Sequence, residues 1–200
     1  MRKKIILIIC LFAAIAMHAQ KAKDAFISLP ESMLLDLNNN ARLDLVDLYE
    51  AGQEAIVLNS FKDSIFLEKL TDDYFYLKTE ASSIQGIVLR MINESSLYCL
   101  IQTACAPICD SRIEFYSVSW NQLNSDIFIT PATSAWFLNE NENLPTLDIS
   151  LMQWIYDPET SSLRQIYNTP QNLSKEDQAR ILHAVKNEIK EYKWNSIRFE

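Results

Sequence analysis

The stretch SIQGIVLRMINESSLYCLIQT, residues 83–103, decides the fold. Two runs rich in β-branched, aliphatic and aromatic residues flank the short polar segment 93–96, and both runs have the composition of β-strands. A connection this short forces the two strands to run antiparallel, because a parallel pair needs a crossover of a dozen residues or more. Gly86 interrupts the first run, which indicates a bulge or a place where another group approaches the backbone closely. The stretch is therefore predicted to form an antiparallel hairpin.

The same pattern continues on both sides of this hairpin. Short polar turns such as Thr71–Asp73 separate further runs of strand-forming residues. Because turns of this length join antiparallel neighbours, the middle of the chain is predicted to be a β-meander. We predict strands over residues 56–58, 65–70, 74–79, 83–92, 97–103, 112–120, 151–156 and 163–168.

Helical patterns lie at both ends of the chain. Residues 30–36 begin with a proline and residues 41–51 are followed by a glycine, which are typical of helix starts and ends. Near the C-terminus, Ser174 and Asp177 form a capping-box pattern before an amphipathic helix. Its predicted buried stripe is Ile181, Leu182, Val185 and Ile189. The sequence therefore predicts the α+β class, with an antiparallel β-meander sheet packed with an N-terminal helical pair and a C-terminal amphipathic helix.

The N-terminal segment has the pattern of a secretory signal peptide. Three basic residues precede an apolar stretch too short to span a membrane, and Ala19 is a small residue before the predicted cleavage site. We expect residues 1–19 to be removed and residues 20–200 to form a single α+β domain in the periplasm or outside the cell. No later apolar stretch reaches the roughly 20 residues of a membrane-spanning helix. Cys10 lies in the middle of the apolar stretch, which argues against a lipid anchor.

The composition excludes several classes of function. The chain contains 26 acidic and 18 basic residues, for a net charge of −8, and an acidic protein binds nucleic acid poorly. Its two glycines cannot build a phosphate-binding loop or a nucleophile elbow, which need several glycines close together. His183 is the one histidine outside the predicted signal peptide, so histidine-rich zinc sites are excluded. We interpret His183 as a packing or boundary residue beside the apolar face of its helix, and we expect no cofactor.

Residues 36–47 have the spacing of a calcium-binding loop between two helices. Oxygen-bearing side chains occupy positions 1, 3, 5, 9 and 12 of a twelve-residue loop. Against this interpretation, position 6 is Ala41, where the sharp turn of such a loop favours glycine. The alternative is a helix capped by Asn39 or Asn40, with acidic residues on its exposed face, and we favour it. The calcium-loop residues are Asp36, Asn38, Asn40, Asp44 and Asp47.

Three cysteines lie outside the predicted signal peptide. The segment CAPIC, residues 105–109, lies at the turn of a predicted hairpin, which places Cys105 opposite Cys109 at a distance that allows a disulfide. A structural disulfide, two reduced thiols and a redox-active pair all remain open. The spacing of three residues and the absence of a βαβ pattern argue against redox chemistry. Cys99 shares a strand face with apolar residues and is expected to be a buried thiol.

Several segments taken together resemble a domain-of-unknown-function family of small exported proteins of Bacteroidales. In order, they are PESMLLDLNNNARLDLVDLYEAG, LTDDYFYL, CAPICDSRIEFY, SW and YKWNSIRF. The resemblance spans nearly all of residues 20–200 and implies location and lineage, without an assigned activity. It also implies that relatives carry the Asn-Asn-x-Arg-x-Asp-Leu core at 39–45 without a full set of calcium ligands, which supports the capped helix.

These features together predict an acidic, exported domain that acts by binding, without catalysis. The partner would be another envelope protein, a peptide or a glycan, and nucleic acid is not expected to bind. Two alternatives remain open: a calcium-stabilised structural protein that uses residues 36–47, and a thiol-dependent redox protein that uses the CAPIC hairpin. Large aromatic residues are often binding anchors. The tryptophans that could serve as such anchors are Trp120, Trp136, Trp154 and Trp194.

Overall fold

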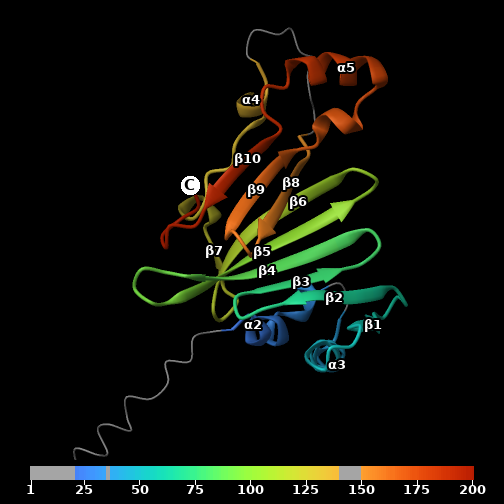
Figure 1. Ribbon diagram of the computed structural model, residues 1–200, viewed down its shortest axis with the longest axis vertical. Helices are drawn as coiled ribbons and strands as arrows, with labels where there is room; N and C mark the ends of the chain where they lie inside the picture. Colours follow the sequence, from blue (N-terminus) through green and yellow to red (C-terminus); the bar gives the residue numbers. More distant parts are fainter. Residues whose placement is uncertain (1–20, 35–36, 140–149) are drawn as a thin grey trace, which may run out of the picture.

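The computed structural model describes residues 21–34, 37–139 and 150–200, and the statements below concern these residues. The predicted α+β class is confirmed: a seven-stranded antiparallel sheet lies between a pair of N-terminal helices and a three-stranded sheet (Figure 1). In this part of the chain, no helix is long and apolar enough to cross a membrane.

The bounds of the secondary-structure elements are as follows. The α-helices are α2 (Ala22–Ser28), α3 (Asn39–Glu50), α4 (Ser134–Phe137) and α5 (Lys175–Ala184). The 3₁₀ turns are η1 (Glu31–Met33), η2 (Ser125–Ile127) and η3 (Thr169–Asn172). The large sheet contains β1 (Ile56–Leu58), β2 (Ser64–Leu70), β3 (Tyr74–Lys78), β4 (Ser82–Arg90), β5 (Ser96–Cys105), β6 (Cys109–Ser117) and β7 (Gln122–Leu123). The small sheet contains β8 (Met152–Asp157), β9 (Ser162–Tyr167) and β10 (Ile189–Lys193).

The large sheet is a meander in which each strand pairs with the next along the chain, from β1 at one edge to β7 at the other. The quoted stretch forms its centre, where β4 and β5 pair from Ser82 opposite Ala104 to Arg90 opposite Ser96. In the small sheet, β9 lies between β8 and β10. Short turns therefore set the order of strands in the large sheet and join β8 to β9, whereas η3 and α5 lie between β9 and β10.

Both faces of the large sheet are buried. On β5, Leu97, Cys99 and Ile101 belong to the core under the small sheet, whereas Tyr98 and Leu100 belong to the core under the N-terminal helices. Successive side chains of a strand point to opposite faces. Burial on both sides thus explains the nearly continuous apolar run of β5. The N-terminal helices and the small sheet both pack on the large sheet.

Gly86 marks a close approach rather than a bulge. A Cβ atom at this position would lie 2.0 Å from Cε1 of Phe75, whose ring covers the glycine from the neighbouring strand. Phe75 in turn packs against Phe26 of α2, with the ring centroids 5.2 Å apart. The irregularity in register lies in β2 instead, between Leu67 and Lys69. Gly86 therefore makes room for the aromatic contact between the sheet and α2.

Arg42 joins the two N-terminal helices. Its side chain is buried, and Nη1 donates hydrogen bonds to the carbonyl oxygens of Phe26, Ile27 and Leu29 at the end of α2. Burial lowers the pKa of Arg42, and the nearby Glu31 carboxylate opposes that shift. The last carbonyls of a helix have no partners within the helix. Arg42 of α3 therefore supplies the C-terminal cap of α2.

Side-chain amides cover the outer edge of β8. The Tyr156 N–H donates to Oε1 of Gln85 at 3.0 Å, and Nε2 of Gln85 donates to the Trp154 carbonyl at 3.3 Å. Asn168 adds a second link between the sheets, since its Nδ2 donates to the Cys109 carbonyl at 2.9 Å. Buried main-chain groups need such partners. The edge of β8 is thus already hydrogen-bonded to the large sheet.

Two sequence-based predictions of helices need correction. The first helix is α2, and the predicted helix over 30–36 is only a 3₁₀ turn at Glu31–Met33, with residues 35–36 outside the described residues. The stripe of the C-terminal helix is also shorter than predicted. Leu182 is 53% exposed, and Ile189 lies in β10, because the chain leaves the helix after Ala184 to pair with β9.

Candidate functional site

Three of the five predicted calcium-loop residues lie on one helix, and a fourth caps it. Asn38 caps α3, since its Oδ1 accepts a hydrogen bond from the Ala41 N–H at 3.0 Å, so the cap lies before both predicted candidates, Asn39 and Asn40. Asn40, Asp44 and Asp47 lie within α3, and Asp36 lies outside the described residues. Among the described residues, no three histidine, cysteine or carboxylate side chains are grouped to hold a metal ion. The helix spreads Asn40, Asp44 and Asp47 along its length, at about 1.5 Å of rise per residue, instead of wrapping them around one point.

Cys105 and Cys109 form a disulfide across the β5–β6 hairpin, with their Cα atoms 3.9 Å apart. The bridge closes a very short loop, and Asn168 binds the carbonyl of Cys109 from the small sheet. Cys99 is a free cysteine that is completely buried between the two sheets. Burial raises the pKa of Cys99 far above its ordinary value, so its thiol stays protonated at neutral pH.

The Cys99 thiol is expected to resist alkylation in the folded protein. Thiol reagents attack the exposed thiolate, and burial removes both the exposure and the charge. Iodoacetamide at pH 8, followed by mass spectrometry of the peptide that contains Cys99, should show little labelling without denaturant and complete labelling in urea. Equal labelling rates under the two conditions would contradict the buried position of this thiol.

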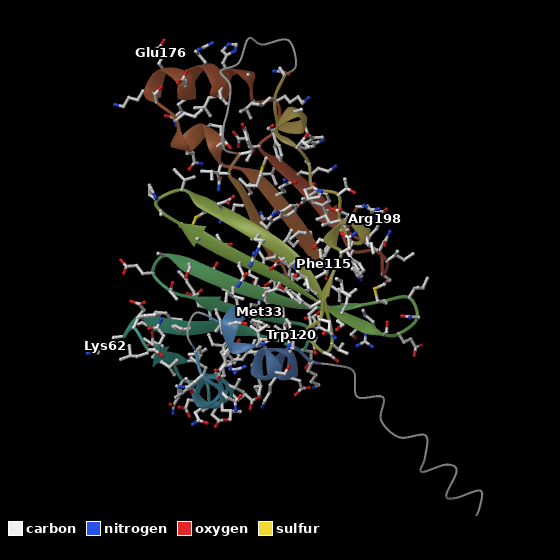
Figure 2. All side chains as sticks on the ribbon, turned by 180° about the vertical axis from the view of Figure 1, so that it is seen from behind. Met33, Lys62, Phe115, Trp120, Glu176 and Arg198 are labelled. Atoms are coloured by element: carbon white, nitrogen blue, oxygen red, sulfur yellow. A yellow bond between two sulfur atoms is a disulfide. The ribbon has the colours of Figure 1, made fainter. Side chains whose placement is uncertain are left out.

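The tryptophans are mostly engaged in structural contacts. Trp154 is buried between the sheets, and Trp120 donates from Nε1 to Oγ of Ser28, which links the sheet to α2 (Figure 2). The Lys190 ammonium lies over the ring of Trp136, with Nζ 5.2 Å from the ring centroid. Trp194 donates to the carbonyl of Arg90 at 2.8 Å. His183 was predicted to be a packing or boundary residue; its side chain is exposed on the last turn of α5, which contradicts packing and leaves the boundary alternative.

A cleft of about 590 Å³ lies beside Trp194, at the end of β3. Two pairs of its polar side chains already bind one another. Lys21 and Asp72 form an ion pair at 3.1 Å, and Oγ1 of Thr71 donates to Asp73 at 2.9 Å. A ligand here would have to replace these interactions as well as displace water. The cleft is therefore a weaker candidate than a surface whose groups lack partners.

Such a surface lies at the edge strand β1. The Leu67 N–H donates to the Ala55 carbonyl, and the Asn59 N–H donates to the Asp63 carbonyl. Hydrogen-bonded pairs alternate along an antiparallel ladder, so Val57 also bonds to β2. The main chain of Leu58, one residue further, then faces away from β2. Since β1 is the outermost strand, no other strand of the described residues pairs with this edge.

Apolar side chains surround this open edge. Leu58 is 61% exposed, Phe61 in the β1–β2 turn is 74% exposed, and Ile56 is 36% exposed. A groove of about 540 Å³ runs between α3 and β1, with Leu48 and Val57 among its apolar walls. We call these five residues the β1 edge surface. Figure 1 shows α3 beside β1 at the end of the molecule away from α5.

Unpaired carboxylates line the same groove. Asp44 and Asp47 of α3 form part of the wall of the groove. Neither forms an ion pair with any described residue. By contrast, Glu50 of the same helix pairs with Lys23 at 2.7 Å. The groove thus combines apolar walls, an open main chain and negative charge.

Sequence reasoning found the strand at 56–58 but missed this surface. β1 is an edge strand because of the order in which the strands of the large sheet pair, and the sequence of one strand does not show that order. One local signal was available: Phe61 lies in the otherwise polar turn NSFKD, residues 59–63. A large aromatic residue in a polar turn indicates either a buried anchor or an exposed contact residue.

Comparisons with known proteins give a family and a fold. The family model described as "Protein of unknown function (DUF3256)" matches residues 14–199. A search of curated proteins found no match. The chain is similar to a solved structure described as a domain of an uncharacterised protein from Porphyromonas gingivalis W83. The two chains share 24% identity with a TM-score of 0.75, and the similarity covers 88% of this chain and 95% of that chain. This level of identity shows the shared fold alone.

Proposed function

The chain belongs to the DUF3256 family of proteins of unknown function, and from this premise we propose that it is a non-catalytic interaction domain of the cell envelope. In this proposal the domain binds a partner protein through the β1 edge surface. The family supplies no activity that could be transferred, so the proposal depends on the surface itself.

The observation that carries the proposal is the open, apolar edge of β1. Proteins ordinarily blunt or cover such an edge, because its unpaired main-chain groups pair readily with other chains. This protein covers the edge of β8 with the Gln85 amide. At β1 it instead exposes Leu58 and Phe61. Exposed apolar residues around an unpaired strand are typical of a binding surface.

Export to the envelope is part of the proposal, and features of the sequence support it. Residues 1–19 have the charge, apolar length and small terminal residue of a signal peptide. The Cys105–Cys109 disulfide fits an oxidising compartment, where such bonds persist. The calcium-stabilised alternative has less support, because Asp44 and Asp47 lie along α3. The redox alternative has less support because the disulfide lies in a plain β-hairpin.

Site-specific photo-crosslinking tests the proposal. Leu58 would be replaced by p-benzoylphenylalanine in the full chain, expressed in its native cells, and irradiated. The matched control is the same replacement of Leu182, which is 53% exposed on α5 at the other end of the molecule. We expect one discrete adduct from position 58, in the envelope fraction, and none from position 182. Equal adducts from both positions, no adduct, or protein only in the cytoplasm would contradict the proposal.

A further inference from the structure

We infer that the partner adds an extended, positively charged segment to β1 as a further strand of the large sheet. The inference rests on the proposed function and specifies the chemistry of the partner. Strand addition is a recurrent mode of peptide recognition, in which main-chain bonds supply affinity and alternate side chains supply specificity.

The main chain of β1 offers the required groups. The Ile56 N–H already donates a hydrogen bond to the Glu54 carbonyl at 3.1 Å. The Ile56 carbonyl and both main-chain groups of Leu58 face outward, because the hydrogen-bonded register with β2 falls on Val57. An incoming strand would lie about 4.8 Å from β1. It would add one strand to the sheet, paired along the three residues of β1.

The two sides of β1 differ, so an added strand would meet different surfaces with alternate residues. Val57 points toward α3 and lines the groove together with Leu48. Ile56 and Leu58 point to the opposite side. Apolar residues of the partner would therefore pack against Ile56 and Leu58, and the residues between them would enter the groove.

The charge of the groove selects long cationic residues for those intervening positions. A lysine or arginine can lay its aliphatic stem along apolar walls and keep its charged end at a polar rim. Here the stem would lie on Leu48 and Val57, and the charge would reach the unpaired carboxylates of Asp44 and Asp47. No cation of the described residues already neutralises these two groups.

The same charge disfavours a second copy of this chain as the occupant. The chain has a net charge of −8, and a β1–β1 pairing would bring two copies of Asp44 and Asp47 together. Like charges across an interface oppose association. The partner segment is therefore an extended stretch of another protein in which apolar residues alternate with lysine or arginine.

A labelled peptide tests the inference directly. The probe is a fluorescent eight-residue peptide in which valine alternates with lysine, and the matched probe carries glutamate in place of lysine. Fluorescence anisotropy with the full chain should show saturable binding of the lysine peptide and none of the glutamate peptide. Asp44→Asn/Asp47→Asn should weaken binding about fivefold. Glu176→Gln/Glu188→Gln makes the same change in charge elsewhere, on α5 (Figure 2) and beside the end of β9, where the Glu188 carbonyl accepts from the Tyr167 N–H, and should leave binding within about twofold.

A second pair of variants tests the main-chain contact. Leu58→Pro removes the outward N–H without removing a bond to β2, and Leu58→Thr keeps that N–H while it shortens the side chain. We expect Leu58→Pro to weaken binding about fivefold more than Leu58→Thr does. Equal effects of the two variants would overturn strand addition. Equal loss from the two charge variants would overturn recognition by Asp44 and Asp47.

Failure of this inference is distinguishable from failure of the proposed function. A discrete crosslink from position 58 with no binding of the lysine peptide would overturn the partner class and retain the interaction surface. Dimerisation of the protein in analytical ultracentrifugation that Leu58→Pro abolishes would overturn the inference in favour of a second copy. Absence of the crosslink would remove the proposed function and the inference together.

Discussion

Gly86→Ala is expected to destabilise the protein by about 3 kcal/mol or more, which is at the upper end of the range for overpacked cores. The added methyl group would lie 2.0 Å from Cε1 of Phe75. That ring is held in place, because Phe75 is buried and packs against Phe26 with the centroids 5.2 Å apart. Relief of the clash would therefore move α2 away from the sheet. Urea unfolding followed by far-UV circular dichroism would measure the loss.

Two further variants separate the clash from other effects of alanine. Phe75→Leu combined with Gly86→Ala should cost at least 1 kcal/mol less than the sum of the two single changes, because the ring that causes the clash is gone. Gly52→Ala serves as a matched control. Gly52 has a φ of +68° with no atom near the added Cβ, so it reports backbone strain alone, of about 1 kcal/mol. A cost below 1 kcal/mol for Gly86→Ala would contradict the close approach.

Arg42→Met is the second change with a large expected effect, a loss of about 3–5 kcal/mol. Methionine fills much of the same space but donates no hydrogen bond. The carbonyls of Phe26, Ile27 and Leu29 would then lose their shared donor at the buried end of α2. Chemical denaturation would give the total cost. Hydrogen exchange would show whether residues 22–29 lose protection before the strands do.

Controls for Arg42 concern geometry and charge. Arg42→Lys keeps the charge but replaces a planar group with a point donor, so we expect an intermediate loss. Arg112→Met removes an exposed guanidinium that pairs with Glu114 at 3.1 Å, and such pairs contribute about 1 kcal/mol or less. If Arg42→Met cost no more than Arg112→Met, the capping role of Arg42 would be wrong.

Local patterns were sufficient for most of the sheet. Short polar turns and dense apolar runs placed the central strands within a few residues of their observed bounds, since a turn such as Thr71–Asp73 constrains the residues on either side of it. The capping-box pattern at Ser174 was also sufficient for the start of α5, where Oγ of Ser174 accepts a hydrogen bond from the Asp177 N–H. In each case the deciding contacts lie within a few residues of one another.

Features that depend on distant parts of the chain were not predictable in this way. Arg42 lies in the first turn of α3 among polar residues, and nothing nearby in the sequence shows that it is buried against the end of α2. Ile189 continued the helical spacing of α5, but its strand exists because β9 offers a partner edge. The β1 edge surface has the same origin. Its strand was visible in the sequence, whereas its place at the edge depends on the order of the whole sheet.

The small sheet also sets the order in which this protein can fold. One face of the large sheet, including Ile101 of β5 and Phe115 of β6, is covered by β8–β10 and by Phe199, whose ring lies 6.3 Å from that of Phe115. Those covering residues are synthesised after the large sheet, because they follow it in the chain. A nascent chain must therefore present an uncovered apolar sheet until residue 199 has emerged, and a holding chaperone would have a ready binding site there.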